Sequence, residues 1–283
     1  MTAPTGLQRI AEATRRLDAA GVPGPHGDAM ALMAHAFDRL LRYALYAELS
    51  RPLPDDVAAR FDAAIDARVA RQPVAQITGR RAFWKHDFRV TRDTLDPRPE
   101  TETLVAEALR LPWRSVLDMG TGTGAILISL LAERPGTTGL GVDLSPAAVE
   151  VARGNAARLG VAADFAVSDW FSAVTGRFDL IVSNPPYIAA AEMPDLSPEV
   201  RDWEPRMALT DESDGLTAYR AIAAGAGPHL APGGALVVEI GPTQGASVAA
   251  LFRAAGLTDV TIRPDLDGRD RVVIGRLAPV SSN

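Results

Sequence analysis

Apolar residues recur at helical spacing near the start of the chain, and two breaks divide this region into three helical stretches. The first apolar stripe consists of Leu7, Ile10, Ala11, Thr14 and Leu17. Glycine and proline in residues 21–25 interrupt the pattern, and Asp28 is placed to cap a second helix. Residues 51–54 form the second break, after which Asp55 or its neighbour starts a third helix. Residues 1–75 therefore predict a small helical domain.

The pattern changes to alternation between apolar and polar positions in residues 76–97. Phe83, Phe88 and Val90 are the apolar positions, and a turn is expected near Lys85. This spacing predicts a short β-hairpin that connects the helical domain to the rest of the chain.

Short apolar runs alternate with helical stretches from residue 98 to the end of the chain. This order is typical of an α/β fold built on a parallel sheet. Two final runs around a polar loop predict an antiparallel pair that closes the sheet. The expected strands cover residues 115–118, 139–142, 163–167, 180–182, 233–240, 260–262 and 272–274.

A glycine-rich turn follows the first of these strands and opens a helix, which brings backbone N–H groups close to a ligand. The turn contains Gly120, Thr121, Gly122, Thr123 and Gly124. Its spacing differs from the G-x-G-x-x-G of NAD-binding proteins, and Asp118 directly before it would repel a pyrophosphate. Asp143 ends the second strand, where a carboxylate accepts hydrogen bonds from both ribose hydroxyls. S-adenosylmethionine, which has an ammonium group, a ribose and no phosphate, suits this arrangement.

The third strand leads to Asp169 and Trp170. An indole and a carboxylate at the end of a strand can flank a purine, with the indole as a wall and the carboxylate accepting from an exocyclic amine. The alternative is that Trp170 is a tryptophan of the hydrophobic core.

The fourth strand ends at the sequence Asn184, Pro185, Pro186 and Tyr187. Two prolines remove two backbone donors and fix two φ angles, so the sheet cannot continue through this loop. The amide oxygen of Asn184 and the carbonyl of Pro185 can accept both hydrogens of a planar NH2 group, and Tyr187 offers a flat face. We call residues 184–187 the slot and predict that it orients the NH2 group of a substrate, whose nitrogen is a weak nucleophile. The alternative is that these residues form only an ordinary turn at the end of a strand.

Composition restricts the classes of function without choosing among them. The chain has 283 residues, 47% of them apolar, a net charge of −6 and no cysteine. Disulfides, thiolate metal sites and cysteine nucleophiles are therefore excluded. Residues 1–75 contain nine arginines and nine acidic residues, and this balance of charge argues against a surface that binds nucleic-acid phosphates. Because no apolar run approaches 18 residues, a cytoplasmic protein that does not span a membrane is expected.

Taken together, these motifs resemble the amino methyltransferases, and over nearly the whole chain they resemble the bacterial release factor glutamine methyltransferases, also called the HemK family. The resemblance includes the glycine-rich turn, Asp143, the slot at residues 184–187 and a Pro-Arg-Pro-Glu-Thr-Glu stretch at residues 97–102. Further matching motifs are Gln72-Pro73, Phe83-Trp84, Asp202-Trp203-Glu204-Pro205, Asp214-Gly215-Leu216 and Gly268-Arg269-Asp270-Arg271.

The resemblance implies a seven-stranded Rossmann-like methyltransferase domain at residues 98–283, after a helical domain at residues 1–75 that docks the substrate. The implied reaction transfers a methyl group from S-adenosylmethionine to the glutamine amide in the Gly-Gly-Gln motif of peptide chain release factors. It gives N5-methylglutamine and needs neither a metal nor nucleic acid. The implied cofactor residues are those of the turn, Asp143, Trp170 and Asn184, and the implied substrate residues are those at 184–187, with Asn184, Pro185 and Tyr187 catalytic.

Two other substrates remain open on the same slot. One is the glutamine of ribosomal protein L3, and the other is an adenine or cytosine amine in nucleic acid. Asp96 and the pair Asp211 and Glu212 depart from residues common in the family, which affects docking more than chemistry. Arg98 lies in a proline-stiffened loop, where it either faces a ligand or is a solvated linker residue.

Overall fold

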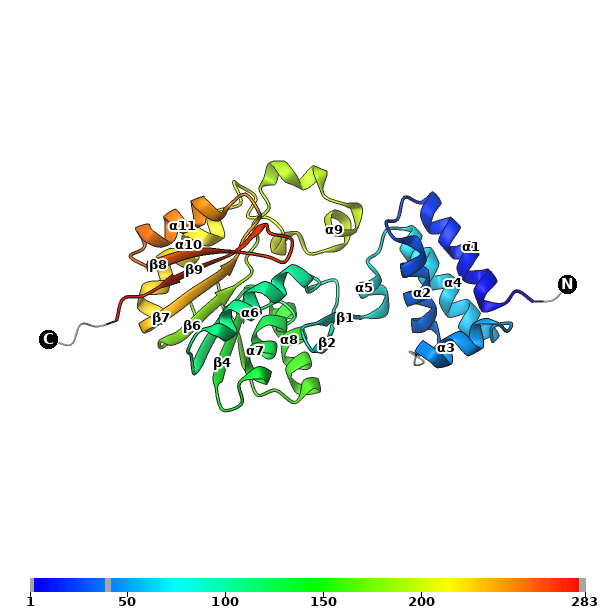
Figure 1. The fold of residues 1–283 in the computed structure, drawn as a ribbon, viewed down its shortest axis with the longest axis horizontal. Helices are drawn as coiled ribbons and strands as arrows, with labels where there is room; N and C mark the ends of the chain where they lie inside the picture. Colours follow the sequence, from blue (N-terminus) through cyan, green and yellow to red (C-terminus); the bar gives the residue numbers. More distant parts are fainter. Residues whose placement is uncertain (1–2, 39–41, 280–283) are drawn as a thin grey trace. The chain divides into compact units, whose positions relative to one another are not determined.

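The computed structural model describes residues 3–38 and 42–279. Residues 1–2, 39–41 and 280–283, which fall within the expected domain ranges 1–75 and 98–283, lie outside the described residues. The chain divides into two compact units. Unit 1 combines Met1–Gly79 with Ser197–Trp203, and unit 2 combines Arg80–Leu196 with Glu204–Asn283. Figure 1 follows the chain through both.

Unit 1 is helical and has its own hydrophobic core. Its helices are α1 (Gly6–Ala19), α2 (Pro25–Ala36), α3 (Arg42–Leu49), α4 (Asp55–Val69), α5 (Val74–Thr78) and α9 (Pro198–Trp203). Leu17, Leu32 and Phe61 are among its fully buried side chains. The expected cap at Asp28 is wrong: α2 begins one turn earlier, because Gly24 adopts a positive φ and Pro25 takes the first helical position.

Helix α9 belongs to unit 1 although it lies more than 100 residues beyond α5 in the sequence. Glu199 accepts hydrogen bonds from Arg71 at 2.7 and 2.8 Å and forms an ion pair with Arg68 at 2.9 Å. The side chain of Gln76 donates to the backbone carbonyl of Trp203 at 3.0 Å. The Arg68 side chain is only 5% exposed, so this is a buried charge network and not a surface pair.

Unit 2 starts with the hairpin β1 (Arg80–Phe83) and β2 (His86–Arg89), which pair antiparallel. Asn155 accepts a hydrogen bond from the backbone N–H of Arg89 and donates to the carbonyls of Arg89 and Thr123. One buried amide therefore ties the hairpin to the loop that contains the glycine-rich turn.

The main sheet has seven strands in the order β5-β4-β3-β6-β7-β9-β8. Five neighbouring strands are parallel and the last two pair antiparallel, which confirms the expected fold class. The strands are β3 (Ser115–Met119), β4 (Thr138–Asp143), β5 (Asp164–Val167), β6 (Phe178–Ser183), β7 (Leu230–Glu239), β8 (Thr258–Pro264) and β9 (Asp270–Arg276).

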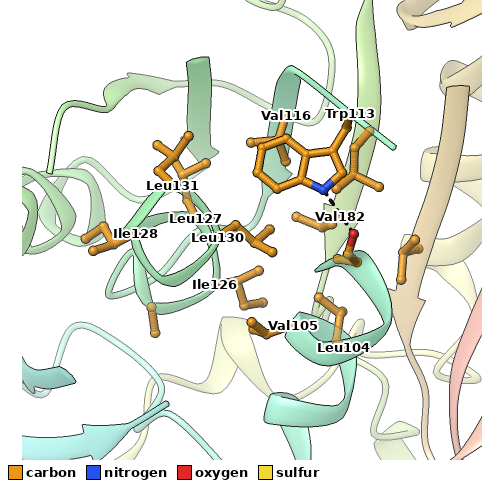
Figure 2. Packing of buried hydrophobic residues seen from close by; sticks show 14 of the residues in the cluster. Leu104, Val105, Trp113, Val116, Ile126, Leu127, Ile128, Leu130, Leu131 and Val182 are labelled. Carbon is orange, nitrogen blue, oxygen red and sulfur yellow. Dashed lines mark hydrogen bonds between the residues drawn. The ribbon is translucent and has the colours of Figure 1, made fainter. Parts of the chain in front are cut away.

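Helices cover both faces of this sheet, and each face has its own buried cluster. In Figure 2 the side chains of Leu104, Ile126 and Leu130 point toward the sheet residues Val116 and Val182. The indole N–H of Trp113 donates to the carbonyl of Ala108 at 2.9 Å, so its polar atom is satisfied within this core (Figure 2). One cluster draws on α6 (Glu102–Arg110), α7 (Ala125–Glu133) and α8 (Pro146–Leu159), and the other on α10 (Thr217–His229) and α11 (Gly245–Ala254).

Three short 3-10 segments complete the described part of the chain: η1 (Pro99–Thr101), η2 (Ala190–Asp195) and η3 (Arg206–Ala208). Segment η1 leads directly into α6, and η2 and η3 flank α9 in the sequence. Within residues 3–38 and 42–279, no helix is both long and apolar enough to cross a bilayer.

Candidate functional site

The glycine-rich turn connects the carboxyl end of β3 to α7. The backbone N–H groups of Gly120 and Thr121 both donate to the carbonyl of Val142 in β4 at 2.9 Å, which holds the turn against the neighbouring strand. Gly120 and Gly122 have positive φ angles, and a Cβ added to either would meet no atom within 4 Å. These two glycines therefore allow the turn and leave space in front of it.

Gly124 has a different role from the other two glycines. Its φ is +78°, and a Cβ there would lie 2.9 Å from Cδ1 of Ile128 and 3.2 Å from Cβ of Ala152. The residue permits close packing where α7 begins, beside α8.

The Asp143 carboxylate links the glycine-rich turn to the loop after β4. Its Oδ2 accepts from the backbone N–H of Gly122 and its Oδ1 accepts from that of Ser145, both at 2.9 Å. Burial raises the pKa of Asp143, and the backbone hydrogen bonds from Ser145 and Gly122 oppose that rise. Each oxygen keeps a second acceptor position for a ligand hydroxyl.

Asp118 lies beneath the turn and is fully buried. Its Oδ2 accepts from the hydroxyl of Thr121 at 2.7 Å. Burial raises the pKa of Asp118 to about 7, and the hydrogen bond from Thr121 opposes that rise. This carboxylate therefore supports the turn from within.

Trp170 follows β5 in a left-handed backbone conformation, with φ at 47°. The hydroxyl of Ser168 donates to the carbonyl of Trp170 at 2.7 Å and accepts from the backbone N–H of Ala173 at 3.0 Å, which fixes this turn. The indole is half-buried and packs against the cluster that contains α10 and α11. The ring therefore packs against a core cluster and also lines a pocket.

Asn184 directly follows β6 and is half-buried. Its Nδ2 donates to the hydroxyl of Thr101 at 3.2 Å, and its Oδ1 has no hydrogen-bond partner among the described residues. Pro185 is buried, and the carbonyl of Tyr187 accepts from Nε2 of Gln244 at 2.9 Å. Burial raises the pKa of Tyr187 to about 12, so its phenol stays neutral at physiological pH.

One pocket of unit 2 brings most of the predicted residues together. Its wall contains Gly120, Thr121, Gly122, Thr123, Asp143, Asp169, Trp170, Asn184 and Pro186. Four of the residues discussed above are not among the described residues that line this pocket: Asp118, Gly124, Pro185 and Tyr187. The carboxyl ends of β3, β4, β5 and β6 thus meet at one site, as expected for a parallel sheet.

Arg98 lines the same pocket and is not a solvated linker residue. Its Nη2 donates to both oxygens of Glu204 at 2.6 and 2.7 Å. The Glu204 side chain is 1% exposed, and burial raises its pKa to about 7 against the opposing charge of Arg98. Neither Glu204 nor Thr101 has a site role in the sequence prediction, although both lie in motifs that carry the family resemblance.

The described residues contain no group of three or more histidine, aspartate or glutamate side chains that could hold a metal ion. The pocket instead offers oxygen acceptors, an indole wall and a turn with open space. Such a site suits a polar organic ligand and the orientation of a second group beside Asn184.

Comparison with known proteins agrees with this arrangement. Residues 8–79 match the family described as PrmC N-terminal domain, and residues 92–197 match the family described as Methyltransferase small domain. A solved structure of a methyltransferase from Pyrococcus furiosus has a TM-score of 0.55 and 18% identity, and covers 75% of this chain and 98% of its own. That likeness supports the fold.

Two curated relatives extend over nearly the whole chain. A release factor glutamine methyltransferase from Cereibacter sphaeroides is 58% identical over 95% of this chain and 99% of its own length. One from Rhodospirillum rubrum is 46% identical over 92% of this chain and 82% of its own length. On this evidence the chain belongs to the release factor glutamine methyltransferase family.

Proposed function

We propose that this chain transfers a methyl group from S-adenosylmethionine to the side-chain amide nitrogen of a release factor glutamine. The glutamine is that of the Gly-Gly-Gln motif, and the product is N5-methylglutamine. The names of the curated relatives support the reaction. The structural observation that supports it most is Asn184, which lines the pocket: its amide nitrogen donates to Thr101, and its Oδ1 has no hydrogen-bond partner in the part of the chain that the structure describes.

The residues of the turn fit the cofactor. Side chains at Gly120 and Gly122 would enter the open space that the pocket provides, so glycine keeps that space for a ligand. Asp143 would accept from the ribose hydroxyls, and the indole of Trp170 would flank the adenine, with Asp169 near its exocyclic amine. When bound, S-adenosylmethionine supplies an electrophilic methyl group on a sulfonium.

The slot at residues 184–187 would hold the glutamine amide. The Oδ1 of Asn184 and the carbonyl of Pro185 would accept its two N–H groups, while Pro186 and Tyr187 shape the slot. An amide nitrogen is a poor nucleophile because its lone pair is delocalised. Holding both hydrogens to one side leaves the lone pair free to attack, so orientation and fixed dipoles replace a strong base.

Unit 1 would dock the protein substrate. Its sequence carries balanced charge, nine arginines against nine acidic residues in residues 1–75, and this supports a protein partner over a nucleic-acid one. We propose that the reaction has no direct nucleic-acid requirement, involves no membrane, and takes place in the cytoplasm where release factors act.

Incubation with labelled S-adenosylmethionine tests the proposal. Label should transfer to a purified release factor, and not to ribosomal protein L3 or to DNA or RNA. The variant Asn184→Ala should lower kcat by on the order of a hundredfold, as removal of oriented polar groups does in other enzymes. Its cofactor affinity, measured by calorimetry, should remain. Full turnover in the variant, or transfer to L3 or a nucleic acid instead, would contradict this assignment.

A further inference from the structure

The two prolines of the slot give it no backbone donor of their own. Pro185 and Pro186 have no N–H group, so neither can be held by a hydrogen bond that its backbone donates. The start of the slot is fixed, because Asn184 directly follows β6 and donates to Thr101. The position of the far end, at Tyr187, therefore depends on the groups that bind its carbonyl and the residue after it.

Gln244, which directly precedes α11, binds this far end. Its Nε2 donates to the carbonyls of Tyr187 at 2.9 Å and Gly215 at 3.2 Å. Its Oε1 accepts from the backbone N–H of Gly241 at 3.0 Å. A backbone carbonyl can only accept and a backbone N–H can only donate, so these partners allow one orientation of the Gln244 amide. This half-buried side chain thus joins the loops that follow β6, precede α10 and follow β7.

Gly215 makes the close approach to the slot possible. Its φ is +75°, and a Cβ there would lie 2.4 Å from the carbonyl oxygen of Tyr187 and 3.0 Å from Nε2 of Gln244. Both the backbone conformation and the lack of space therefore require glycine. Any side chain at this position would displace the Tyr187 carbonyl or the group that donates to it.

The turn that contains Gly215 is itself fixed by Asp211, one of the residues that depart from the family pattern. The Asp211 carboxylate accepts from three backbone N–H groups, at 2.9, 3.0 and 2.8 Å: those of Ser213, Gly215 and Thr217. The residue after the slot is attached nearby, because the backbone N–H of Ile188 donates to the carbonyl of Leu209 at 3.0 Å. The slot therefore ends against a turn that is held in place by its own hydrogen bonds.

We propose that Gln244 and Gly215 are positioning residues that fix Tyr187 and, through it, the geometry in which the slot holds the substrate amide. Neither is among the described residues that line the pocket, so each acts through Tyr187 and not on a ligand. This inference deepens the proposed function and rests on it for the identity of the substrate. A misplacement of about 1 Å can lower a rate by about a hundredfold, so loss of either residue should lower kcat.

Turnover of two Gln244 variants tests the first residue. Gln244→Glu keeps the shape of the side chain and the acceptor for Gly241, but at pH 8 its carboxylate has no hydrogen to donate to Tyr187. It should lower kcat by about tenfold or more and leave the KM for S-adenosylmethionine unchanged. Gln244→Leu removes all three hydrogen bonds and should lower kcat at least as far. Wild-type kcat in either variant would overturn the role of Gln244.

A pair of glycine variants tests the second residue. Gly256, which follows α11, has a φ of +83°, and a Cβ there would meet no atom within 4 Å. Gly215→Ala and Gly256→Ala thus share the cost of alanine in the left-handed region, but only the first places a methyl group against the Tyr187 carbonyl. The kcat of Gly215→Ala should fall by about tenfold or more, and that of Gly256→Ala should stay near wild type. Equal kcat values in the two variants would overturn the role of Gly215.

Hydrogen exchange of backbone amides keeps the inference separate from the proposed function. The N–H of Gly241 should exchange slowly in the wild type and in Gln244→Glu, and faster in Gln244→Leu, which lacks its acceptor. The N–H of Ile188 should exchange faster in both variants, because the end of the slot is no longer held. If the wild type does not methylate a release factor, the proposed function fails while this measurement still decides on the anchor. Unchanged protection of Ile188 in both variants would refute it.

Discussion

Asp118 beneath the glycine-rich turn makes the stability of unit 2 depend on pH in a defined direction. The variant Asp118→Asn replaces a fully buried carboxyl with a neutral group of the same shape. Its amide oxygen can still accept from the hydroxyl of Thr121, which is 2.7 Å from Oδ2 in the wild type. The substitution therefore removes one titration and leaves the packing of the turn intact.

The size of the effect follows from the pKa. Burial raises the pKa of Asp118 from 3.8 to about 7 in the folded chain. Between these values the folded state holds one proton more than the unfolded state, so rising pH lowers the free energy of unfolding by about 1.4 kcal/mol per pH unit. The contribution is complete below pH 3.8 and lost above about pH 7, an upper limit of about 4 kcal/mol.

Urea unfolding of both proteins between pH 5 and pH 8 measures this difference, with tryptophan fluorescence as the probe. The free energy of unfolding of Asp118→Asn relative to wild type should rise through pH 7 and then level off. Glu204 and Glu239, with pKa values that burial also raises to about 7, titrate in the same range. Both glutamates change the free energy of unfolding equally in the wild type and in Asp118→Asn. Their effect therefore cancels in the difference between the two proteins, which reports on Asp118.

Asp164→Asn, at an exposed position of β5, controls for the change in net charge. The rise in relative stability that is expected for Asp118→Asn should be absent from this control, because a substitution at an exposed position removes no buried group. A relative stability of Asp118→Asn that stays constant or falls between pH 5 and pH 7 would refute the reasoning about Asp118.

Two further substitutions test the cofactor site and unit 1. Asp143→Ala frees the backbone N–H groups of two loops, so cofactor affinity should fall about tenfold or more by calorimetry, and unchanged affinity would remove Asp143 from the site. Glu199→Ala leaves the buried Arg68 with fewer partners and should destabilise unit 1 by about 1–3 kcal/mol in thermal unfolding. Asp66→Ala, which breaks an exposed pair with Arg16, should cost less than about 1 kcal/mol, and equal losses would contradict the role of Glu199.

The sequence by itself determined the order of the elements in unit 2. Short apolar runs bounded by glycine, proline and aspartate specify strands locally, and all seven appear where the pattern indicated them. It also determined the rigid end of β6, since two prolines preclude further sheet pairing whatever surrounds them. The glycine-rich turn and Asp143 could likewise be placed on one edge of the sheet from the sequence alone, because parallel strands end at a common edge.

Only the tertiary structure decided which distant residues meet. Thr101 and Asn184 are 83 positions apart in the chain, and they meet where the end of β6 lies beside η1, with the Nδ2 of Asn184 donating to the Thr101 hydroxyl at 3.2 Å. The burial of Glu204 and its pairing with Arg98 likewise depend on contacts that no local pattern encodes.

Unit 1 shows the same division between local and tertiary determinants. Helix α9 belongs to it through Glu199, whose partners precede it by more than 120 residues. The start of α2 also differed from the sequence prediction, because Gly24 and Pro25 set the local backbone where an aspartate cap at Asp28 was expected. Hydrophobic periodicity and turn residues act over a few positions in the sequence, and they therefore determine where helices and strands form. Burial and pairing across the fold fix the environment of each functional side chain, and with it that side chain's chemistry.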